Sequence, residues 1–209
     1  MGRSPTDTKA KLIQTATDLI WQSSYGSVSV DDICNQAGVK KGSFYYYFPS
    51  KADLAVAVME ESYKCYEPEM TSVFSETVSA VERFERLATF VYDKQIEAYN
   101  QYGRVCGCPF ASLGSEMAGN DEAIRQKADE IFQRQEHLLV ETLKELVIDA
   151  QLPSDTDLAG IASEIHTFIL GQVMVARIQN DLTNLREDVK NGLFRIINIH
   201  EALPKTVAK

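Results

Sequence analysis

Residues 28–54 read Val-Ser-Val-Asp-Asp-Ile-Cys-Asn-Gln-Ala-Gly-Val-Lys-Lys-Gly-Ser-Phe-Tyr-Tyr-Tyr-Phe-Pro-Ser-Lys-Ala-Asp-Leu, and this stretch decides the fold. Ser29, followed three residues later by Asp32, matches the capping box that starts a helix. The next apolar positions repeat at helical spacing and provide one buried stripe: Val30, Ile33 and Ala37. Gly38 follows directly, and glycine takes the left-handed conformation that ends a helix at the least steric cost. The first half of the stretch therefore predicts a short helix closed by a glycine turn.

A second short helix is predicted to begin with four residues: Lys40, Lys41, Gly42 and Ser43. Phe44 and Phe48 lie four residues apart, so they share its buried face. The three consecutive tyrosines at 45–47 cannot all be buried, and we expect at least one or two of them to point outward. Pro49 ends this helix, because the residue before a proline disfavours helical geometry. The capping pattern is then repeated for a third helix by two residues: Ser50 and Asp53.

The side chains on this second helix are of the types that bind DNA. Lysines neutralise phosphates, while hydroxyls and the N–H groups at a helix start hydrogen-bond phosphate oxygens. Lysine also donates to guanine in the major groove, and Gly42 leaves the start of the helix bare for close approach. The alternative is a helical hairpin of another module with solvent-facing lysines. The two caps, the glycine turn and the hydroxyl-rich helix together favour a DNA-reading helix-turn-helix.

From Lys9 to Leu54 the chain resembles the tetracycline-repressor (TetR) family of transcription regulators. The resemblance rests on a recurring set of residues: Ile13, Ala16, Leu19, Ile20, Tyr25-Gly26, Val30, Ile33, Ala37-Gly38-Val39, Gly42-Ser43-Phe44-Tyr45, Tyr47-Phe48 and Lys51-Leu54. It implies an all-helical homodimer with a DNA-binding domain at residues 1–50, its motif at about 29–48, and an effector-binding and dimerisation domain at 51–209. It also implies a recognition helix from Lys40 to Tyr46. Phosphate contacts would come from Ser29, Ser43, Tyr46 and Lys51, and positions at or near the bases are implied for Lys40, Lys41, Gly42 and Tyr45. Tyr46 departs from the family, in which histidine is frequent at this position.

Composition agrees with a protein of the cytoplasm. The chain has 209 residues, 44% of them hydrophobic, which is enough to bury a sizeable core. We find no run of 18 apolar residues and no hydrophobic signal core near the start, so we expect neither a membrane span nor export. Four irregularly spaced cysteines do not form a disulfide framework and favour a reducing compartment.

The net charge of −9 is unusual for a DNA-binding protein, but it is unevenly distributed. Residues 1–55 carry six basic and five acidic side chains, a net charge of +1. The rest of the chain carries fifteen basic and twenty-five acidic side chains, a net charge of −10. The acidity therefore belongs to the C-terminal part, which we expect to stand away from the phosphates, and specific binding must depend on dimerisation.

Helical periodicity continues along the chain, without strand alternation, and predicts an all-α fold. A first helix is expected at 8–24. A helix from 51 to 66 is expected to end because of Pro68, and another spans 79–101. A small-residue helix follows a break at 103–107, and Asn120 is expected to cap a long helix that ends near Ala150. After Pro153 two more helices are expected, at about 156–180 and 185–200.

The segment Cys106-Gly107-Cys108-Pro109 starts the small-residue helix, and three interpretations of it stay open. The cysteines line a pocket or core, or one thiol senses an electrophile or oxidant, or the pair binds a metal. No metal site or cofactor is expected, because His137, His166 and His200 show no ligand spacing. Pro109 at the first helical position makes Cys108 the N-cap and the better candidate for a reactive thiol. The expected effector site is a larger set: Tyr66, Phe84, Val91, Tyr99, Cys106, Cys108, Phe110, Leu113, Met117, His137 and Gln172.

The last two expected helices carry more apolar surface than one domain needs, which favours a partner. Gly171 allows close approach. We expect dimer contacts from eight residues: Ile161, Ile165, Phe168, Ile169, Val173, Leu193, Ile196 and Ile197. Ordinary packing within the chain accounts for part of this surface.

These observations predict a ligand-released repressor that binds a pseudo-palindromic operator as a homodimer. Its partners would be double-stranded DNA, a second copy of the chain and a small effector of hydrophobic or electrophilic character. One alternative is a thiol sensor of electrophiles or oxidants with the same fold. Another is a helical small-molecule-binding protein or an enzyme without a function on DNA. We find no catalytic triad pattern, phosphate-binding glycine loop or metal motif, so no enzymatic activity is expected.

Overall fold

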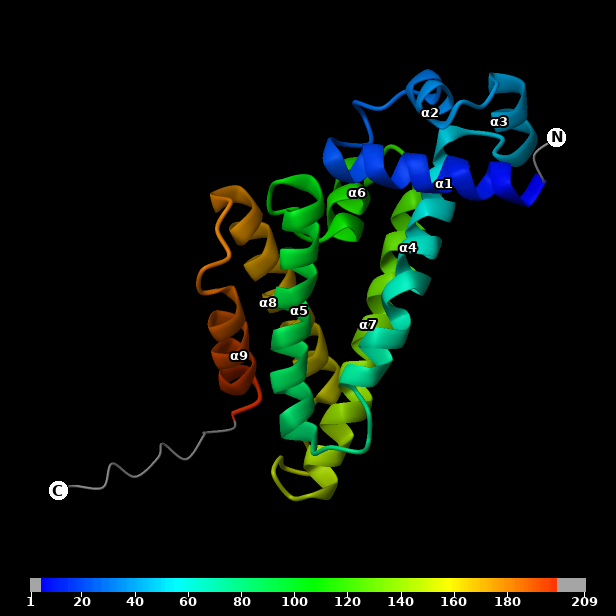
Figure 1. Ribbon diagram of the computed structural model, residues 1–209. Helices are drawn as coiled ribbons and strands as arrows, with labels where there is room; N and C mark the ends of the chain where they lie inside the picture. The colour runs from blue at the N-terminus through cyan, green and yellow to red at the C-terminus, as the bar shows by residue number, and fades with distance from the viewer. Residues whose placement is uncertain (1–4, 199–209) are drawn as a thin grey trace. The chain divides into compact units, whose positions relative to one another are not determined.

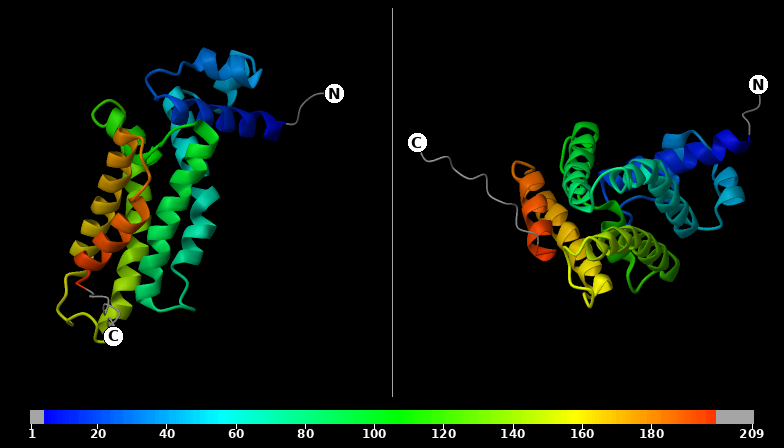
Figure 2. Two further views of the ribbon diagram at one scale, coloured as in Figure 1. Left: turned by 60° about the vertical axis from the view of Figure 1, so that its left-hand side comes forward. Right: turned by 90° about the horizontal axis from the view of Figure 1, so that it is seen from below.

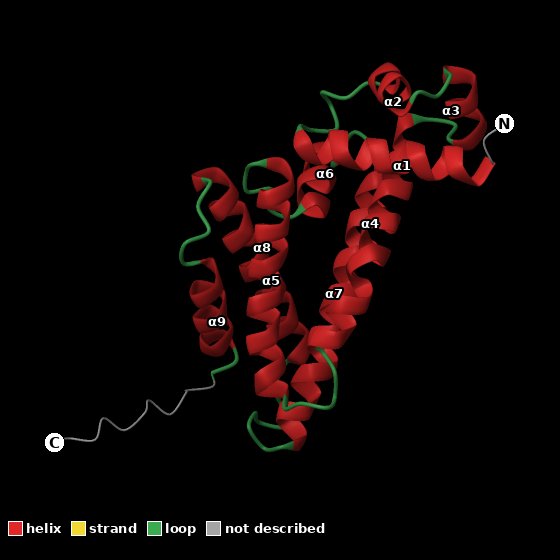
Figure 3. Cartoon of the chain, in the orientation of Figure 1, coloured by secondary structure: helices red, strands yellow, loops and turns green. Residues whose placement is uncertain are grey.

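The computed structural model describes residues 5–198, and this part of the chain is helical, without strands (Figures 1 and 3). The helices are α1 (Pro5–Gln22), α2 (Val30–Ala37), α3 (Lys41–Tyr47), α4 (Lys51–Val73), α5 (Ala80–Tyr102), α6 (Pro109–Met117), α7 (Glu122–Ile148), α8 (Leu158–Gln179) and α9 (Leu185–Ile196). The all-α prediction is confirmed. His200 lies outside the described residues.

The chain divides into two compact units. The first unit comprises the residues up to Glu69 together with Cys106–Gln133, and the second comprises Met70–Val105 together with the residues from Arg134 onward. Helices α4 and α7 contribute residues to both. The functional boundary predicted at residue 50 stays a prediction, and α6 belongs to the same compact unit as the helix-turn-helix.

The core of the first unit joins the three N-terminal helices to parts of α4, α6 and α7. Its fully buried side chains come from every one of these elements: Leu12, Ile33, Phe44, Leu54, Leu113, Ile124 and Ile131. Burying a large aliphatic or aromatic side chain contributes about 1.5–3 kcal/mol, so this shared core holds α6 against the N-terminal helices.

Some predicted helix boundaries were wrong. Pro68 lies inside α4 instead of ending it, and Pro68 and Lys64 are both exposed, so water can bond the Lys64 carbonyl that lacks an N–H partner. Asp121, not Asn120, caps α7: its Oδ1 accepts from Ile124 N–H at 3.1 Å, while Asn120 N–H bonds Met117 O and closes α6. The last helix ends at Ile196, because Asn198 takes a left-handed φ of 54°.

In the second unit α9 packs against both α5 and α8 (Figure 2). Its core is formed by large apolar side chains of α5, α7, α8 and α9: Phe84, Leu143, Leu146, Ile165, Val189 and Leu193. Gly192 of α9 provides the space for the Phe168 ring of α8, because a Cβ at this position would overlap the ring. The contact of α8 with α9 therefore depends on glycine at position 192.

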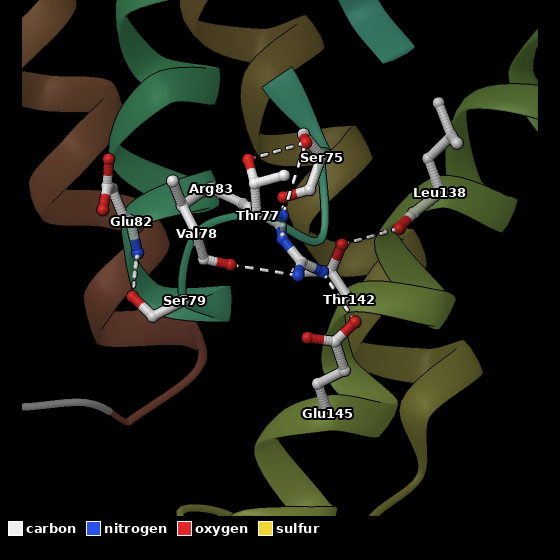
Figure 4. A network of polar contacts seen from close by, with 9 residues as sticks. All are labelled: Ser75, Thr77, Val78, Ser79, Glu82, Arg83, Leu138, Thr142 and Glu145. Atoms are coloured by element: carbon white, nitrogen blue, oxygen red, sulfur yellow. Dashed lines mark hydrogen bonds and ion pairs between the residues drawn. The ribbon is translucent and has the colours of Figure 1, made fainter. Parts of the chain in front are cut away.

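A buried arginine organises one end of the second unit (Figure 4). The side chain of Arg83 is 3% exposed, and its guanidinium donates in three directions. Nε donates to Ser75 O at 2.8 Å, Nη2 to Val78 O at 3.0 Å, and Nη1 to Glu145 Oε1 at 2.7 Å. Arg83 thus fixes the loop before α5 to the C-terminal part of α7.

Candidate nucleic-acid interface

The helix-turn-helix starts with the predicted capping box. Ser29 Oγ accepts from Asp32 N–H at 3.1 Å, and the Asp32 carboxylate accepts from Ser29 N–H at 2.8 Å. The Ser29 hydroxyl also donates to the Asp32 carboxylate at 2.6 Å, and this bond together with the Ser29 N–H bond lowers the pKa of Asp32. Gly38 ends α2 with a φ of 61°, in the left-handed region. The predicted N-cap and C-cap of α2 are both confirmed.

Helix α3 presents its hydroxyls to solvent above a buried aromatic face. Phe44 is fully buried and Phe48 nearly so, whereas Tyr45 is 49% and Tyr46 is 79% exposed. The prediction that one or two of the tyrosines point outward is therefore confirmed. A Cβ added at Gly42 would meet nothing within 4 Å, so the start of α3 is open to an approaching surface.

The predicted DNA-binding lysines have different surroundings. Lys40 and Lys41 are exposed, and Lys41 Nζ pairs with Asp31 Oδ1 at 2.8 Å, which raises the pKa of Lys41. Lys51 is half-buried: its Nζ donates to Tyr25 O at 2.6 Å and lies 3.8 Å from the centroid of the Tyr25 ring. Burial lowers the pKa of Lys51. An ammonium has three donors, so Lys51 keeps donors beyond the one that binds Tyr25.

The eight predicted DNA-binding residues lie at the start of α2, along α3 and at the start of α4. Six of them are exposed: Ser29, Lys40, Lys41, Gly42, Tyr45 and Tyr46. Ser43 and Lys51 are half-buried. Their individual roles on DNA stay predictions.

Six of the eleven predicted effector residues belong to the first unit: Tyr66, Cys106, Cys108, Phe110, Leu113 and Met117. The ring centroid of Phe110 lies 5.8 Å from that of Tyr66 and 6.4 Å from that of Trp21. Five of the six are in or packed against the apolar core, and Cys106 is half-buried.

Cys108 is the N-cap of α6, as predicted, and its Sγ accepts from Ala111 N–H at 3.4 Å. Burial nevertheless raises the pKa of the Cys108 thiol, although the backbone N–H bonds oppose this shift. The reactivity of the Cys108 thiol stays a prediction, and its burial argues against it because burial disfavours the thiolate.

The other five predicted effector residues belong to the second unit. Phe84 is buried in its core, Val91 and Gln172 are half-buried, and Tyr99 and His137 are exposed. The sequence analysis did not predict that His166 is buried, but this residue is only 7% exposed. Its Nδ1 lies 3.2 Å from Glu136 Oε1 and its Nε2 lies 3.1 Å from Gln135 Oε1. Its position among the apolar residues of α8 was the one available signal.

The residues predicted for the dimer interface divide into two groups. Ile165, Val173, Leu193 and Ile197 are buried in the core of the second unit, so they offer no surface to a partner. The other four predicted contacts remain half-buried: Ile161, Phe168, Ile169 and Ile196. Further apolar surface on α8 comes from Val175 and Ile178, which are 49% and 81% exposed.

By length and composition alone, helix α8 could cross a membrane. In the structure, 22% of its apolar window is buried. A groove of about 730 Å³ lies along α8 and α9 and is lined by Gly160, Ser163, Glu164, Thr167, Phe168, Gly192, Arg195 and Ile196. Across the described residues, no three His, Cys, Asp or Glu side chains are grouped as a metal site would need.

Two family models match the chain. Residues 12–58 match the model described as bacterial regulatory proteins, tetR family. Residues 84–190, about half of the chain, match the model described as tetracyclin repressor-like, C-terminal domain.

Similar proteins are bacterial regulators. An HTH-type transcriptional regulator in the lacX 3′ region of Lactococcus lactis is 25% identical over 186 residues, which are 87% of this chain and 89% of that protein. The HTH-type transcriptional repressor NemR of Escherichia coli K12 is 28% identical over 123 residues, 59% of this chain and 60% of NemR.

Solved structures show the same fold. The reduced form of E. coli NemR superimposes with a TM-score of 0.76 at 24% identity, over 90% of this chain and 96% of that one. A TetR-family regulator from Agrobacterium tumefaciens gives a TM-score of 0.78 at 19% identity, over 92% and 98% of the two chains. With both family models matched in chain order on an all-helical fold, the chain belongs to the TetR family, whose members are transcription regulators and not enzymes.

Proposed function

We propose that the protein is a ligand-released repressor that acts in the cytoplasm and binds a pseudo-palindromic operator as a homodimer. The observation that carries the proposal is the exposed face of α3, where Tyr45 and Tyr46 stand in solvent beside the open start at Gly42. The hydroxyls would bond phosphate oxygens, and the lysines at the start of α3 would reach base edges or phosphates.

A second copy of the chain is the partner that best covers α8. The helix is apolar enough for a membrane span but mostly unburied in one copy, and Ile178 is among its most exposed residues. The groove along α8 and α9 carries both Glu164 and Arg195, so a two-fold symmetric partner could pair the opposite charges. Dimerisation would place two recognition helices about one DNA turn apart, which a single seven-residue helix needs for specificity.

Release would follow from the effector's preference for one conformation. An effector can lower DNA affinity only by as much as its affinities for the two conformations differ. The predicted effector side chains are mainly aromatic and aliphatic, which favours a hydrophobic ligand. The effector-binding role of these eleven residues is part of the proposal.

The test is footprinting of the purified protein on DNA around its own gene. We expect protection of a palindrome, a steep loss of binding with added salt, and loss of protection in the Lys41→Ala, Tyr45→Ala double variant. Lys144→Ala is the matched control, because Lys144 is an exposed lysine of the second unit paired with Glu141 at 2.7 Å. Protection that survives in the double variant would refute the assignment of α3 as the recognition helix.

A thiol sensor of electrophiles or oxidants is the second candidate, and the Cys-Gly-Cys sequence before α6 favours it. The similar E. coli NemR structure is that of a reduced form, which supports the proposal that a thiol of this chain is redox-sensitive. Because burial raises the pKa of Cys108, Cys106 becomes the favoured thiol. N-ethylmaleimide should release the unsubstituted protein from its operator but not the Cys106→Ser variant, and equal release of both would eliminate Cys106 as the sensor.

A further inference from the structure

A glutamate of α6 holds the turn between α1 and α2. Glu116 Oε2 accepts from the N–H of Tyr25 at 3.1 Å, and Glu116 Oε1 accepts from the N–H of Gly26 at 2.7 Å. The partners are 90 and 91 residues apart in the sequence, and all three belong to the first unit. A carboxylate that accepts from two successive backbone N–H groups makes charge-assisted bonds, which are stronger than neutral ones.

Gly26 is the second sign that this contact is specific. Its φ is not in the left-handed region, so its backbone conformation suits any residue. A Cβ built at Gly26 would lie 2.9 Å from Glu116 Oε1, closer than side chains normally approach. Glycine at this position therefore provides the space for the carboxylate, and a larger residue would force the carboxylate to shift.

Tyr25 is held from the other side as well. Its carbonyl accepts from Lys51 Nζ at 2.6 Å, so one peptide segment connects the end of α6 with the start of α4. Ser29, the N-cap of α2, follows three residues after Gly26. The turn therefore sets where α2 begins, while Lys51 marks where the chain leaves α3 for α4. Helices α2 and α3 lie between these two fixed points in the sequence.

We propose that Glu116 is a positioning residue for DNA recognition, which acts by fixing the α1–α2 turn from which the helix-turn-helix begins. The proposal rests on the DNA-binding function proposed above. Without the Glu116 contacts, only a fraction of the molecules would hold α2 and α3 in the position that binds DNA. The observed affinity would be the intrinsic affinity multiplied by that fraction. These two hydrogen bonds would then add to the shared apolar core in coupling α6 to the DNA-reading helices.

A double-mutant cycle tests this role. Glu116→Ala removes the carboxylate, and Gly26→Ala displaces it without changing the charge. We expect each to weaken operator binding about tenfold, and the double variant to bind like Glu116→Ala alone, because both substitutions remove the same contact. Glu122→Ala is the matched control: Glu122 is an exposed glutamate of the first unit, paired with Arg125, and its loss changes the charge equally.

Two further measurements separate positioning from stability. Thermal unfolding should show that all variants are folded at the binding temperature, and amide exchange at Tyr25 and Gly26 should be about tenfold faster in both single variants than in the control. Faster exchange with unchanged operator affinity would overturn the positioning role, as would losses that multiply to about a hundredfold in the double variant. If the unsubstituted protein binds no operator, the proposed function itself fails, while the exchange rates still decide whether Glu116 holds the turn.

Discussion

Replacing Arg83 by methionine should destabilise the fold far more than the same change three residues later. Arg83 and Arg86 both lie on α5, and both pair with a glutamate. The Arg83 side chain is 3% exposed, whereas that of Arg86 is 41% exposed. Arg86 pairs with Glu82 one turn away on the same helix, but Arg83 connects the loop before α5 to α7.

The magnitude follows from the three hydrogen bonds of the guanidinium. Bonds to a charged group contribute about 1.5–3 kcal/mol each, and breaking a buried ion pair by removing one partner costs about 3–5 kcal/mol. The Glu145 side chain is 36% exposed, so water can solvate its carboxylate once Arg83 is gone. We therefore expect a loss of stability at the lower end, about 3 kcal/mol. It would come mainly from the carbonyls of Ser75 and Val78, which lose their hydrogen-bond donor. Arg86→Met should change stability by no more than about 0.5 kcal/mol, as for other exposed pairs.

Urea unfolding followed by circular dichroism measures the difference, at one protein concentration because a dimer's stability depends on it. Arg83→Lys adds a second comparison and should recover only part of the loss, because one ammonium cannot donate in the three directions in which the planar guanidinium donates. If Arg83→Met and Arg86→Met shift the midpoint equally, the network in Figure 4 contributes no more than a surface pair and the reasoning is refuted.

Three further predictions follow from single positions. Gly192→Ala should cost about 1–3 kcal/mol, because its Cβ would overlap the Phe168 ring; an unchanged urea midpoint would contradict this. Ile178→Asp should shift sedimentation toward the monomer, because Ile178 lies on α8, the proposed dimer surface. Ile148→Asp is the control and should cause no shift: the Ile148 side chain is 79% exposed, close to the 81% of Ile178, but it lies on α7. Burial lowers the pKa of His166 in the folded chain even though Glu136 raises it, so the unfolded chain binds the proton first. Stability should therefore fall as the pH drops below about 6.5, and His166→Gln should reduce this slope in pH-dependent urea unfolding.

The helix-turn-helix was predictable from the sequence because its ends are fixed by local chemistry. The Ser29–Asp32 capping box and the left-handed Gly38 involve residues close in sequence, and the structure has both where the pattern places them. Pro68 shows the limit of such rules. A proline removes one helical hydrogen bond, but an exposed position lets water replace it, and the helix continues.

The contacts that connect distant segments were not predictable in this way. No periodicity indicates that Glu116 reaches Tyr25, or that His166 is buried beside Glu136, thirty residues away. The apolar stripe of α8 was recognised, but its spacing could not tell the residues that face the chain's own core, such as Ile165, from those left on the surface, such as Ile178. Helical periodicity identifies an apolar face, and only the packed structure shows how much of that face is already covered.

The surroundings of the lysines sharpen how DNA would be bound. Residues 1–55 have a net charge of only +1, and two of their lysines already have partners in the free protein. The Lys41–Asp31 pair is exposed, and exposed ion pairs contribute little, so a phosphate can replace Asp31 at little cost. Lys51, by contrast, contributes to the turn that Glu116 holds, and its ammonium is better suited to fix Tyr25 than to move. In the proposed dimer, specificity would then come from the placement of hydroxyls such as Tyr46 and from the second copy of the chain.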